Sequence, residues 1–358
     1  MSMESFKRFS PEILEEAAFG VFSASGSPEA EARLLARRLT QASLAGHDSH
    51  GILRVHHYMT QLRDGLIRPG VTPTVERDNG STVLLRGNRA YGQIVAEEGM
   101  RIAIERARER GVAAVGILEN LHIGRLADYV ITAAREGMIG MIFAAAGGSA
   151  QLVTPFGGIR RRWATNPLAV AFPSRREFPV VFDMATSVIA NGKLRVARDE
   201  GRPVEEGLMI DGSGNPSTDP ADMERGGAIL PLGDALGHKG YLLAFLVEVL
   251  GGLLTGAGFA HTEEEPPFSN PSFMIALDVT RFRTLDAFRD ELEQLIAYLK
   301  ATPSRPGEEV LSPGEVEERN ERERRANGIP LPMQTVRNLQ SELDRFGIGT
   351  NLEPLASG

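Results

Sequence analysis

Histidines concentrate in one short stretch of the chain. The segment GHDSHGILRVHHY, residues 46–58, contains four of the seven histidines, together with an arginine and a tyrosine. Helical spacing would align His50, Arg54 and Tyr58 on one face of a helix that begins at this point. An imidazole exchanges protons near neutral pH, and a guanidinium binds a carboxylate through two parallel hydrogen bonds. The pattern therefore predicts proton transfer next to a bound carboxylate.

Two other interpretations of this stretch are a polar helix end and a metal site. Asp48 and Ser49 are typical helix-capping residues, and we assign His56 and His57 to surface or core positions. The HxxH and HExxH spacings of zinc sites are absent, and Arg54 would repel a dication, so we predict no metal. A metal-dependent hydrolase or lyase remains the alternative function. Its ligands would be His47, Asp48, His50 and His122.

Three more candidate positions follow predicted strands. His122 lies in a loop between a strand and a helix that begins at about Gly124, Ser149 follows the next strand, and Asp183 ends another. Open α/β sheets gather ligands at such strand ends. A histidine bonded only to loop backbone is the alternative for His122. The three similar positions nevertheless favour a shared binding site.

A lysine stands at the start of an apolar helix in GHKGYLLAFLVEVLGGLL, residues 237–254. The first turn of a helix carries partial positive charge, so Lys239 is unfavourable there unless an anion lies beside it. We expect a phosphate at this position, with a lysine that extends into solvent as the alternative. The helix is apolar on nearly every face, which is typical of one buried between layers.

Strands and helices alternate through the middle of the chain. Short links join strand, helix and strand in this order, which is typical of a βαβ crossover, so part of the sheet should be parallel. Thr165-Asn166-Pro167 is a turn signal before a further apolar strand. The other predicted elements are strands at 81–87, 112–118, 138–145, 178–183 and 273–278 and helices at 92–111 and 124–137.

Both ends of the chain are predicted to be helical. We divide the chain into an N-terminal helical domain at 1–75 that carries the histidine cluster, an α/β core at 76–290 with the cofactor and substrate segments, and a C-terminal helical segment at 291–358 that packs back on the N-terminal domain. The segment GEVEERNERERRANG, residues 314–328, alternates charges and has little apolar surface. We interpret it as a solvated helix held by i,i+4 ion pairs.

Composition limits the class of protein. With 42% hydrophobic and 24% charged residues, the chain is typical of a globular protein. The net charge of −8 argues against nucleic acid and acidic membranes as partners. The absence of cysteine excludes disulfides and thiolate metal sites. No signal peptide or membrane span is evident, so we expect a cytoplasmic protein.

The usual nucleotide-binding fingerprints are absent. No G-x-G-x-x-G follows a predicted strand, and no G-x-x-x-x-G-K-[ST] occurs. The G-x-G in DGSGNPSTDP continues into a turn-rich loop. A Rossmann or P-loop cofactor site is therefore not supported.

Taken together, several segments resemble the type 2 malate/L-lactate dehydrogenase family, which includes ureidoglycolate and sulfolactate dehydrogenases and Δ1-piperideine-2-carboxylate reductases. They occur in the family's order between about residues 40 and 320, and the ordered set is specific although each match is weak alone. The matching segments are GHDSHGILRVHHY, TNPLAVAFP, FDMATSVIANGK, DGSGNPSTDP, GHKGYLLAFLVEVLGGLL and SPGEVE.

The resemblance implies a fold and an activity. The fold would be a mixed-sheet α/β core that binds NAD or NADP without a Rossmann fold, with a helical domain built from both chain ends, and the protein would be a homodimer. The activity would be hydride transfer between nicotinamide and C2 of a small 2-hydroxy or 2-oxo acid of the malate, lactate or sugar-acid type, or of a cyclic 2-imino acid.

The resemblance also implies roles for individual residues. Ser49, His50 and Asp183 match a proton relay, although some members assign proton transfer to the position of His122. Arg54 matches the residue that binds the substrate carboxylate, Thr165 matches a substrate contact, and we add Tyr58 because it shares the helix face of Arg54. The implied cofactor-binding residues are His122, Gly124, Ser149, Asp183, Met184, Ala185, Lys239, Pro313, Gly314 and Glu315.

Two departures from the family pattern concern the predicted site. Relatives commonly have N-S-x-H where this chain has ENLH at residues 119–122, and G-T-N-P where it has ATNP at residues 164–167. The choice between NAD and NADP, the identity of the acid and the physiological direction are therefore left open.

Overall fold

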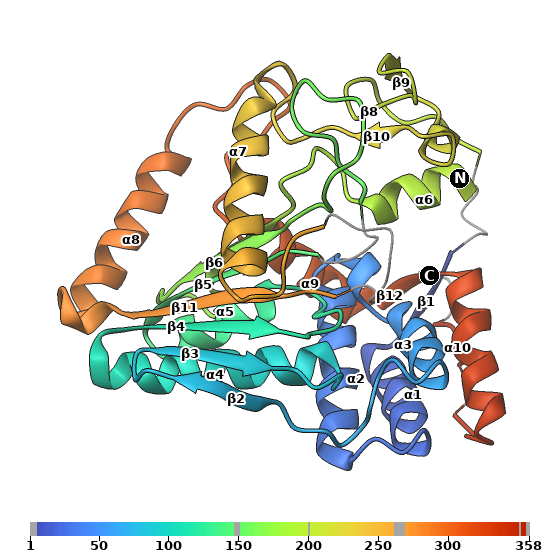
Figure 1. Cartoon of the computed structure of the whole chain (residues 1–358), viewed down its shortest axis with the longest axis horizontal. Helices are drawn as coiled ribbons and strands as arrows, with labels where there is room; N and C mark the ends of the chain where they lie inside the picture. The colour runs from blue at the N-terminus through green and yellow to red at the C-terminus, as the bar shows by residue number, and fades with distance from the viewer. Residues whose placement is uncertain (1–5, 147–150, 200, 261–268, 351, 356–358) are drawn as a thin grey trace.

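A seven-stranded mixed sheet forms the centre of the molecule (Figure 1). The structure is a computed structural model that describes residues 6–146, 151–199, 201–260, 269–350 and 352–355. Within the sheet, β3 and β4 pair in parallel and every other neighbouring pair is antiparallel. In spatial order the strands are β2 (Thr74–Asp78), β3 (Thr82–Arg86), β4 (Val112–Leu118), β11 (Ser272–Asp278), β5 (Met138–Ala144), β6 (Leu168–Phe172) and β7 (Val180–Met184).

The sheet confirms the predicted α/β class and one βαβ crossover. The strand β3, the helix α4 (Gly92–Arg110) and the strand β4 form that crossover. The next predicted unit, from β4 through α5 (Ala127–Arg135) to β5, does not pair its strands, because β11 inserts between them and pairs antiparallel with both. Local periodicity could not predict that β11 lies between β4 and β5, because β11 pairs with strands that are distant in the sequence.

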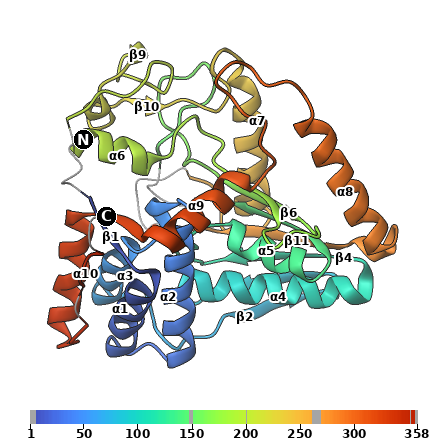
Figure 2. The same ribbon diagram turned by 180° about the vertical axis from the view of Figure 1, so that it is seen from behind.

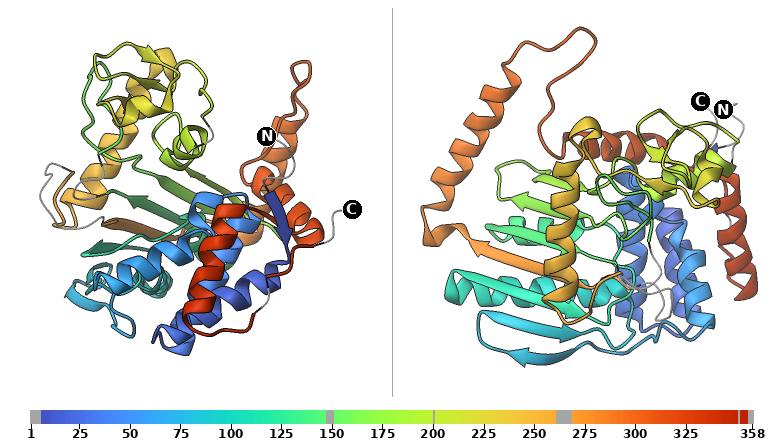
Figure 3. Two further views of the ribbon diagram at one scale, coloured as in Figure 1. Left: turned by 90° about the vertical axis from the view of Figure 1, so that its right-hand side faces the viewer. Right: turned by 45° about the horizontal axis from the view of Figure 1, so that its top comes forward.

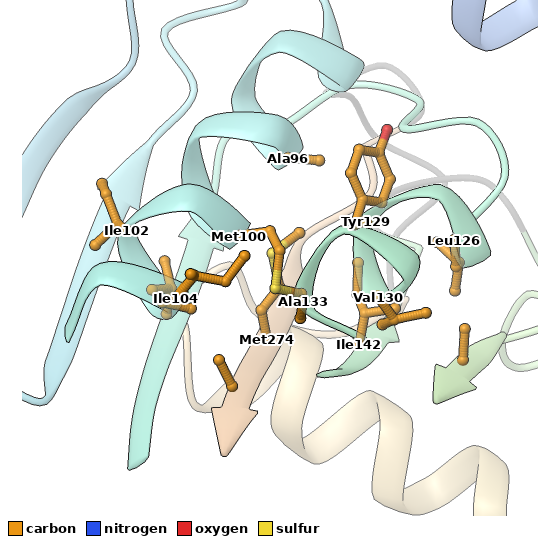
Figure 4. Close-up of a cluster of buried hydrophobic side chains, with 14 of the residues drawn as sticks. Ala96, Met100, Ile102, Ile104, Leu126, Tyr129, Val130, Ala133, Ile142 and Met274 are labelled. Atoms are coloured by element: carbon orange, nitrogen blue, oxygen red, sulfur yellow. The ribbon is translucent and has the colours of Figure 1, made fainter. Parts of the chain in front are cut away.

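Helices α4 and α5 cover one face of this sheet (Figures 1 and 2). Their apolar faces meet the strands in a cluster to which Met100, Val130, Ile142 and Met274 contribute (Figure 4). Each of these four side chains is at most 1% exposed, so each contributes roughly 1.5–3 kcal/mol of burial free energy. The cluster therefore fixes α4 and α5 on the central strands of the sheet.

The two ends of the chain lie together beside the sheet (Figure 1). Strand β1 (Phe6–Phe9) pairs antiparallel with β12 (Ile329–Pro332), and α10 (Met333–Arg345) packs against α1 (Pro11–Ala24) and α3 (Arg54–Arg63). Both ends contribute to one buried apolar cluster, which includes Phe22, Val55 and Leu343. These contacts agree with the helical unit that we predict from both ends, while the division into three domains stays a prediction.

A buried carboxylate links α10 to the outer side of α3. Glu342 is 1% exposed and accepts hydrogen bonds from His56 Nδ1 at 2.7 Å and from Arg63 Nη1 at 2.8 Å and Nη2 at 3.2 Å. We expect Glu342→Ala to lower the free energy of unfolding by about 2–3 kcal/mol, because His56 and Arg63 then lose a buried carboxylate acceptor. Urea titration followed by circular dichroism would measure this loss.

The exposed pair of Arg33 and Glu29 provides the matched control. Glu29→Ala removes a carboxylate of the same kind and should change the free energy of unfolding by less than about 0.5 kcal/mol. Equal effects of the two substitutions would show that Glu342 does not link α3 to α10.

A third part of the structure lies above the sheet and the N-terminal helices in Figure 1. It contains a small three-stranded antiparallel sheet and the helix α6 (Asn191–Asp199). The remaining elements of the chain are α2 (Glu29–Leu44), η2 (Asp48–His50), β8 (Met209–Ile210), β9 (Pro216–Ser217), η3 (Pro220–Met223), β10 (Ala228–Ile229), η4 (Asp234–Leu236), α7 (His238–Val247), η5 (Glu248–Leu253), η6 (Val279–Arg281), α8 (Leu285–Lys300) and α9 (Glu315–Asn327).

The apolar helix at 237–254 is not buried between layers, and that prediction is wrong. It forms α7 and the π-helical segment η5, and Leu242, Phe245 and Leu254 are 60%, 53% and 60% exposed. The opposite side of the same helix packs through Ala244 and Val247, which are at most 1% exposed. The apolar pattern therefore predicted the helix correctly, but it did not predict that one face would be exposed among the described residues. In the part of the chain that the structure describes, no helix is long and apolar enough to cross a membrane.

Candidate active site

The histidine-rich stretch folds as two elements rather than one helix. Residues Asp48–His50 form a single 3-10 turn, and α3 begins only at Arg54. The predicted helix is present, but it begins after His50, so the prediction that His50 shares a helix face with Arg54 and Tyr58 is wrong. Gly51 packs directly on α2, where a Cβ atom would lie 2.0 Å from Ser43 Oγ, and its backbone leaves the helical conformation. This break turns His50 out of the α3 face that carries Arg54 and Tyr58.

Tertiary contacts nevertheless bring the predicted residues together. The rings of His50 and His122 stack with their centroids 5.3 Å apart, and Tyr58 Oη lies 2.7 Å from His122 Nδ1. Ser49 Oγ lies 2.8 Å from His50 Nδ1. Residues from the loop before α3, from α3 and from the loop after β4 thus form one cluster.

The hydrogen bonds assign the tautomer of His122. Gln93 Nε2 donates to Tyr58 Oη at 2.5 Å, so the Tyr58 hydroxyl proton is directed at His122 Nδ1. Neutral His122 then carries its own proton on Nε2. It can act as a hydrogen-bond donor toward a substrate oxygen. His50 can adopt either tautomer, because its Nδ1 faces the Ser49 hydroxyl, which can both donate and accept.

Arg54 is a cation without a carboxylate partner. Its Nε donates to the Ser49 carbonyl oxygen at 2.7 Å, which ties α3 to the turn that holds His50. Its terminal nitrogens make no hydrogen bond and no ion pair within the described residues. Burial and the positive charge of Arg195 lower the pKa of Arg54. A guanidinium held in this way is suited to bind an incoming carboxylate in a bidentate manner.

Burial and neighbouring cations hold both imidazoles in the neutral form. The pKa of His50 is lowered to about 3 by burial, reinforced by Arg54, His47 and Arg125. The pKa of His122 lies well below its ordinary value because of burial and the same Arg54 charge. Burial raises the pKa of Tyr58 to about 12, so its hydroxyl stays protonated and donates. The protein without substrate therefore offers a proton acceptor.

The lowered pKa of His50 predicts that the free energy of unfolding depends on pH. An unfolded His50 takes up a proton below about pH 6.5, whereas the folded one does so only near pH 3. Unfolding takes up this proton between the two values, so the free energy of unfolding falls as the pH drops through that window. We expect His50→Gln to reduce the proton uptake on unfolding by up to about one. Urea titrations at several pH values would measure it, and identical slopes for both proteins would contradict the shift.

Asp183 does not reach the imidazole in this structure. Its Oδ2 accepts a hydrogen bond from the Ala127 backbone N–H at 2.9 Å, at the start of α5. Burial raises its pKa, while His47 and Arg125 act in the opposite direction. The predicted relay of Ser49, His50 and Asp183 is therefore connected only between its first two members.

The other predicted substrate-binding and anion-binding residues lie in separate parts of the structure. Thr165 is half-buried and its carbonyl oxygen accepts from the Thr186 backbone and side chain. Lys239 is exposed in the first turn of α7. Ser149 lies outside the described residues. The loop of His122 and Gly124 packs on Gly92, where a Cβ atom would lie 2.3 Å from the His122 carbonyl oxygen.

Two predicted cofactor segments adjoin the same strand. Gly314 has a φ of 87°, and a Cβ atom there would lie 3.1 Å from the Pro179 carbonyl oxygen and 3.2 Å from the Val181 carbonyl oxygen. The turn of residues 313–315 thus packs at β7, the strand that ends with Asp183 and Met184 and leads to Ala185. Glu315 itself binds Lys300 at 2.7 Å and accepts from the Ser312 backbone N–H at 3.0 Å, so its carboxylate holds the turn that precedes α9.

The charged helix α9 lies in front of α2 in Figure 2 and contacts the turn of residues 48–50 through its side chains. No residue of α9 is buried and i,i+4 pairs such as Arg322 with Glu318 are present, as predicted. Its inner side, however, is not simply solvated. Arg324 binds Asp48 at 2.5 and 3.1 Å and also donates to the Ser43 carbonyl oxygen, and Glu317 lies 3.5 Å from His47.

Sequence reasoning missed the residues that support the cluster. Gln93 directs the Tyr58 hydroxyl, Arg125 places a buried cation near His50 and Asp183, and Arg324 fixes the turn at Asp48. A buried glutamine in the first turn of an otherwise amphipathic helix was the one available signal. The two arginines could not be distinguished from the many others in the chain.

The residues of the alternative metal site are engaged elsewhere. Asp48 is bound to Arg324, and His47 to Glu317, while His50 and His122 stack on each other. Among the described residues, no group of three or more histidine, aspartate or glutamate side chains could hold a metal ion. The geometry gives no support to a metal-dependent hydrolase or lyase.

Comparison with known proteins now decides the family. The family model described as malate/L-lactate dehydrogenase matches residues 9–340. The chain belongs to this family. It is 38% identical over 336 residues to hydroxycarboxylate dehydrogenase B of Escherichia coli O157:H7, with 92% of this chain and 91% of that protein covered. It is 36% identical over 345 residues to L-sulfolactate dehydrogenase of Methanothermobacter thermautotrophicus, with 94% and 97% covered.

A solved structure of the malate/L-lactate dehydrogenase family has the same fold. Malate dehydrogenase from Entamoeba histolytica superposes with a TM-score of 0.90 at 31% identity, covering 98% of this chain and 100% of that one. The mixed-sheet α/β fold and the family resemblance are thereby confirmed. As a member of the family, the protein is an oxidoreductase that acts on CH–OH groups. Membership also supports the predicted use of NAD or NADP.

Proposed function

We propose that the protein is an NAD(P)-dependent dehydrogenase that interconverts a small 2-hydroxy acid and its 2-oxo acid, with His50 as the proton acceptor and donor. A cyclic 2-imino acid is the related substrate, since it presents the same carboxylate next to a C=N bond. The observation that carries this proposal is the Arg54 guanidinium, which has no carboxylate partner among the described residues, beside the stacked imidazoles of His50 and His122. A carboxylate bound at Arg54 would bring C2 of the acid to the imidazoles.

His50 acts as a base in the oxidation direction. In the tautomer whose Nδ1–H donates to Ser49 Oγ, the Nε2 lone pair is left for the C2 hydroxyl proton. The hydride leaves C2 as the O–H bond breaks, so the acid becomes a 2-oxo acid and His50 becomes an imidazolium. In the reverse direction the same Nε2 returns the proton. A carboxylate at Arg54 offsets part of the positive charge that lowers the pKa of His50, so substrate binding favours protonation.

His122 orients the reacting oxygen. Its Nε2–H is set by Tyr58 and Gln93 and would donate to the C2 oxygen, while its well-lowered pKa keeps it neutral. The two imidazoles therefore have different roles, because His50 exchanges the proton and His122 orients the substrate oxygen.

The residues of the site fit a nicotinamide dinucleotide. Bound to the protein, this cofactor supplies the hydride acceptor or donor at nicotinamide C4. Arg54 gives the site a positive charge that suits an anionic substrate, whereas the charge of Arg125 is paired with Asp128. The segments at Asp183 to Ala185 and at Gly314 meet at β7 and would line its binding surface, together with the loop of His122 and Gly124.

A coupled panel tests this function. NADH and NADPH would each be combined with pyruvate, oxaloacetate, a 2,3-diketo sugar acid and Δ1-piperideine-2-carboxylate, and the change in absorbance at 340 nm recorded. We expect turnover with at least one acid and one cofactor, and no loss after dialysis against a chelator. No turnover with any pair, in either direction, would contradict the proposal.

The exposed apolar side chains support a homodimer. Phe245 on α7 is 53% exposed, and Leu295 and Tyr298 on α8 are 52% and 77% exposed. Helix α8 projects from the rest of the molecule (Figure 3). Large apolar side chains exposed in this way are typical of subunit interfaces. Light scattering should give twice the monomer mass for the native chain and a lower mass for Phe245→Glu. A native monomer would contradict the proposal. A cytoplasmic location stays a prediction.

A further inference from the structure

A cleft of about 550 Å³ lies between helices α2, α4, α5 and α9, on the side of the molecule where Figure 2 shows α9 next to α2 and α5. Its walls carry six arginines and five carboxylates, together with apolar side chains such as Phe178. The lining includes neither Arg54 nor the two stacked histidines of the proposed active site. The cleft is therefore a separate feature of the molecule.

A buried arginine that lines this cleft has only part of its hydrogen-bonding capacity filled. Arg125 is 3% exposed, and its Nη1 donates to Asp128 Oδ1 at 3.1 Å. Its Nε and Nη2 are buried and have no hydrogen-bond partner among the described residues. Buried polar groups are nearly always hydrogen-bonded, so these two nitrogens lack an acceptor that the described residues do not supply.

A second arginine of the cleft reaches the same aspartate. Arg38 of α2 donates through Nη1 to the Asp128 carbonyl oxygen at 3.5 Å, and its Nη2 binds Glu97. The Nε of Arg38 is also buried without a hydrogen-bond partner among the described residues. Arg38 and Arg125 therefore converge on Asp128 and together leave three donor nitrogens unpaired.

The other charged side chains leave the cleft with an excess of positive charge. Its two arginines on α9 are paired with glutamates of the same helix. Arg37 of α2 and Arg135 of α5 are exposed, and neither has an ion pair or hydrogen bond with a described residue. Glu177 is the cleft carboxylate that lacks an arginine partner in the described part of the chain. Six arginines against five carboxylates leave one positive charge in excess, which favours an anion.

We propose that this cleft is a second binding site, which takes a small multivalent oxyanion such as phosphate or the phosphate group of a metabolite. Arg125 and Arg38 would donate to it through their unpaired nitrogens, and Arg37 and Arg135 would add positive charge from the rim. A phosphate group has enough oxygens to accept from both buried guanidinium groups at once. The inference goes beyond the proposed function, and binding at this site is measured without turnover.

Isothermal titration calorimetry with inorganic phosphate, at constant ionic strength, tests the site. We expect the phosphate site to remain in Arg54→Lys, because Arg54 does not line the cleft. Arg37→Gln should weaken phosphate binding by about 5- to 10-fold, since it removes one cation of the cleft. The matched control is Arg33→Gln, one turn earlier on α2, where the arginine is paired with Glu29 outside the cleft. It should change the Kd by less than about twofold.

Two further variants separate the effect of charge from an effect on folding. Glu177→Gln removes the carboxylate that repels an anion and should tighten phosphate binding by about 2- to 5-fold. Local unfolding of the cleft could not produce such a gain. Arg125→Lys keeps a cation beside Asp128 but loses the guanidinium fork, so it should weaken phosphate binding by about 10-fold or more.

Several results would overturn the inference. Displacement of bound phosphate by NADH would assign the anion to the dinucleotide site. Loss of the phosphate site in Arg54→Lys would assign it to the proposed active site. An unchanged Kd in both Arg37→Gln and Glu177→Gln, or no phosphate binding up to about 10 mM, would show that the cleft does not bind oxyanions.

Discussion

His50→Ala should lower kcat by about 10²- to 10⁴-fold, the usual contribution of a positioned general acid or base. The loss should appear in both directions of the reaction, because the same Nε2 accepts and returns the proton. Its neighbours make His50 specific for this role, since Ser49 Oγ lies 2.8 Å from Nδ1 and Arg54 fixes the same turn at 2.7 Å. Steady-state kinetics with saturating acid and dinucleotide would measure kcat.

The matched control is His56→Ala. His56 lies two residues from Arg54, on the side of α3 that faces Glu342, and its Nδ1 is bound to that carboxylate at 2.7 Å. Its removal should change stability while kcat falls by less than about threefold. If His50→Ala kept native turnover and His122→Ala lost it, proton transfer would belong to His122, and the proposed division of roles would be reversed.

Arg54→Lys should raise the KM of the acid by about 10- to 100-fold, because lysine keeps the charge but loses the two-pronged donor. We expect kcat to change less than KM, since the carboxylate contact is made in both the ground state and the transition state. The effect should be similar for 2-hydroxy and 2-oxo acids, which share the carboxylate. Kinetics in both directions, with dinucleotide at saturation, would separate the two parameters.

Arg63→Lys is the control for this substitution. Arg63 is on the same helix, but both of its terminal nitrogens bind Glu342 and not the pocket. It should leave the KM of the acid within about threefold of the native value. An unchanged KM in Arg54→Lys would mean that the carboxylate is held elsewhere, and the proposed substrate orientation would be wrong.

Local patterns predicted much of the secondary structure. Helical periodicity predicted α4 and α5, and alternating apolar runs predicted β4, β5 and β11, because burial on one face imposes these periods on any amphipathic element. The same reasoning failed at α3. Gly51 packs against Ser43 of α2, and the turn ends at His50. Periodicity within one segment cannot predict such a contact with another helix.

Site residues divide in the same way. Residue type and the ordered motifs identified His50, Arg54 and His122, since few side chains exchange protons near neutrality or bind a carboxylate with two donors. Their supporting residues were not predictable. Gln93 reaches Tyr58 across 35 positions of sequence, and Arg324 reaches Asp48 across 276, so only folding brings each pair together.

The amino-acid order alone therefore determined the class of fold, the chemical groups and the family, because each depends on residue types and on periods within single elements. The tertiary structure decided which groups meet, which are ionised and which cations lack partners. Stacking of His50 on His122, the lowered pKa of His50 and the lack of a carboxylate partner for Arg54 among the described residues all depend on segments that are distant in sequence. Distance and burial in three dimensions set those energies, and no spacing along the chain encodes them.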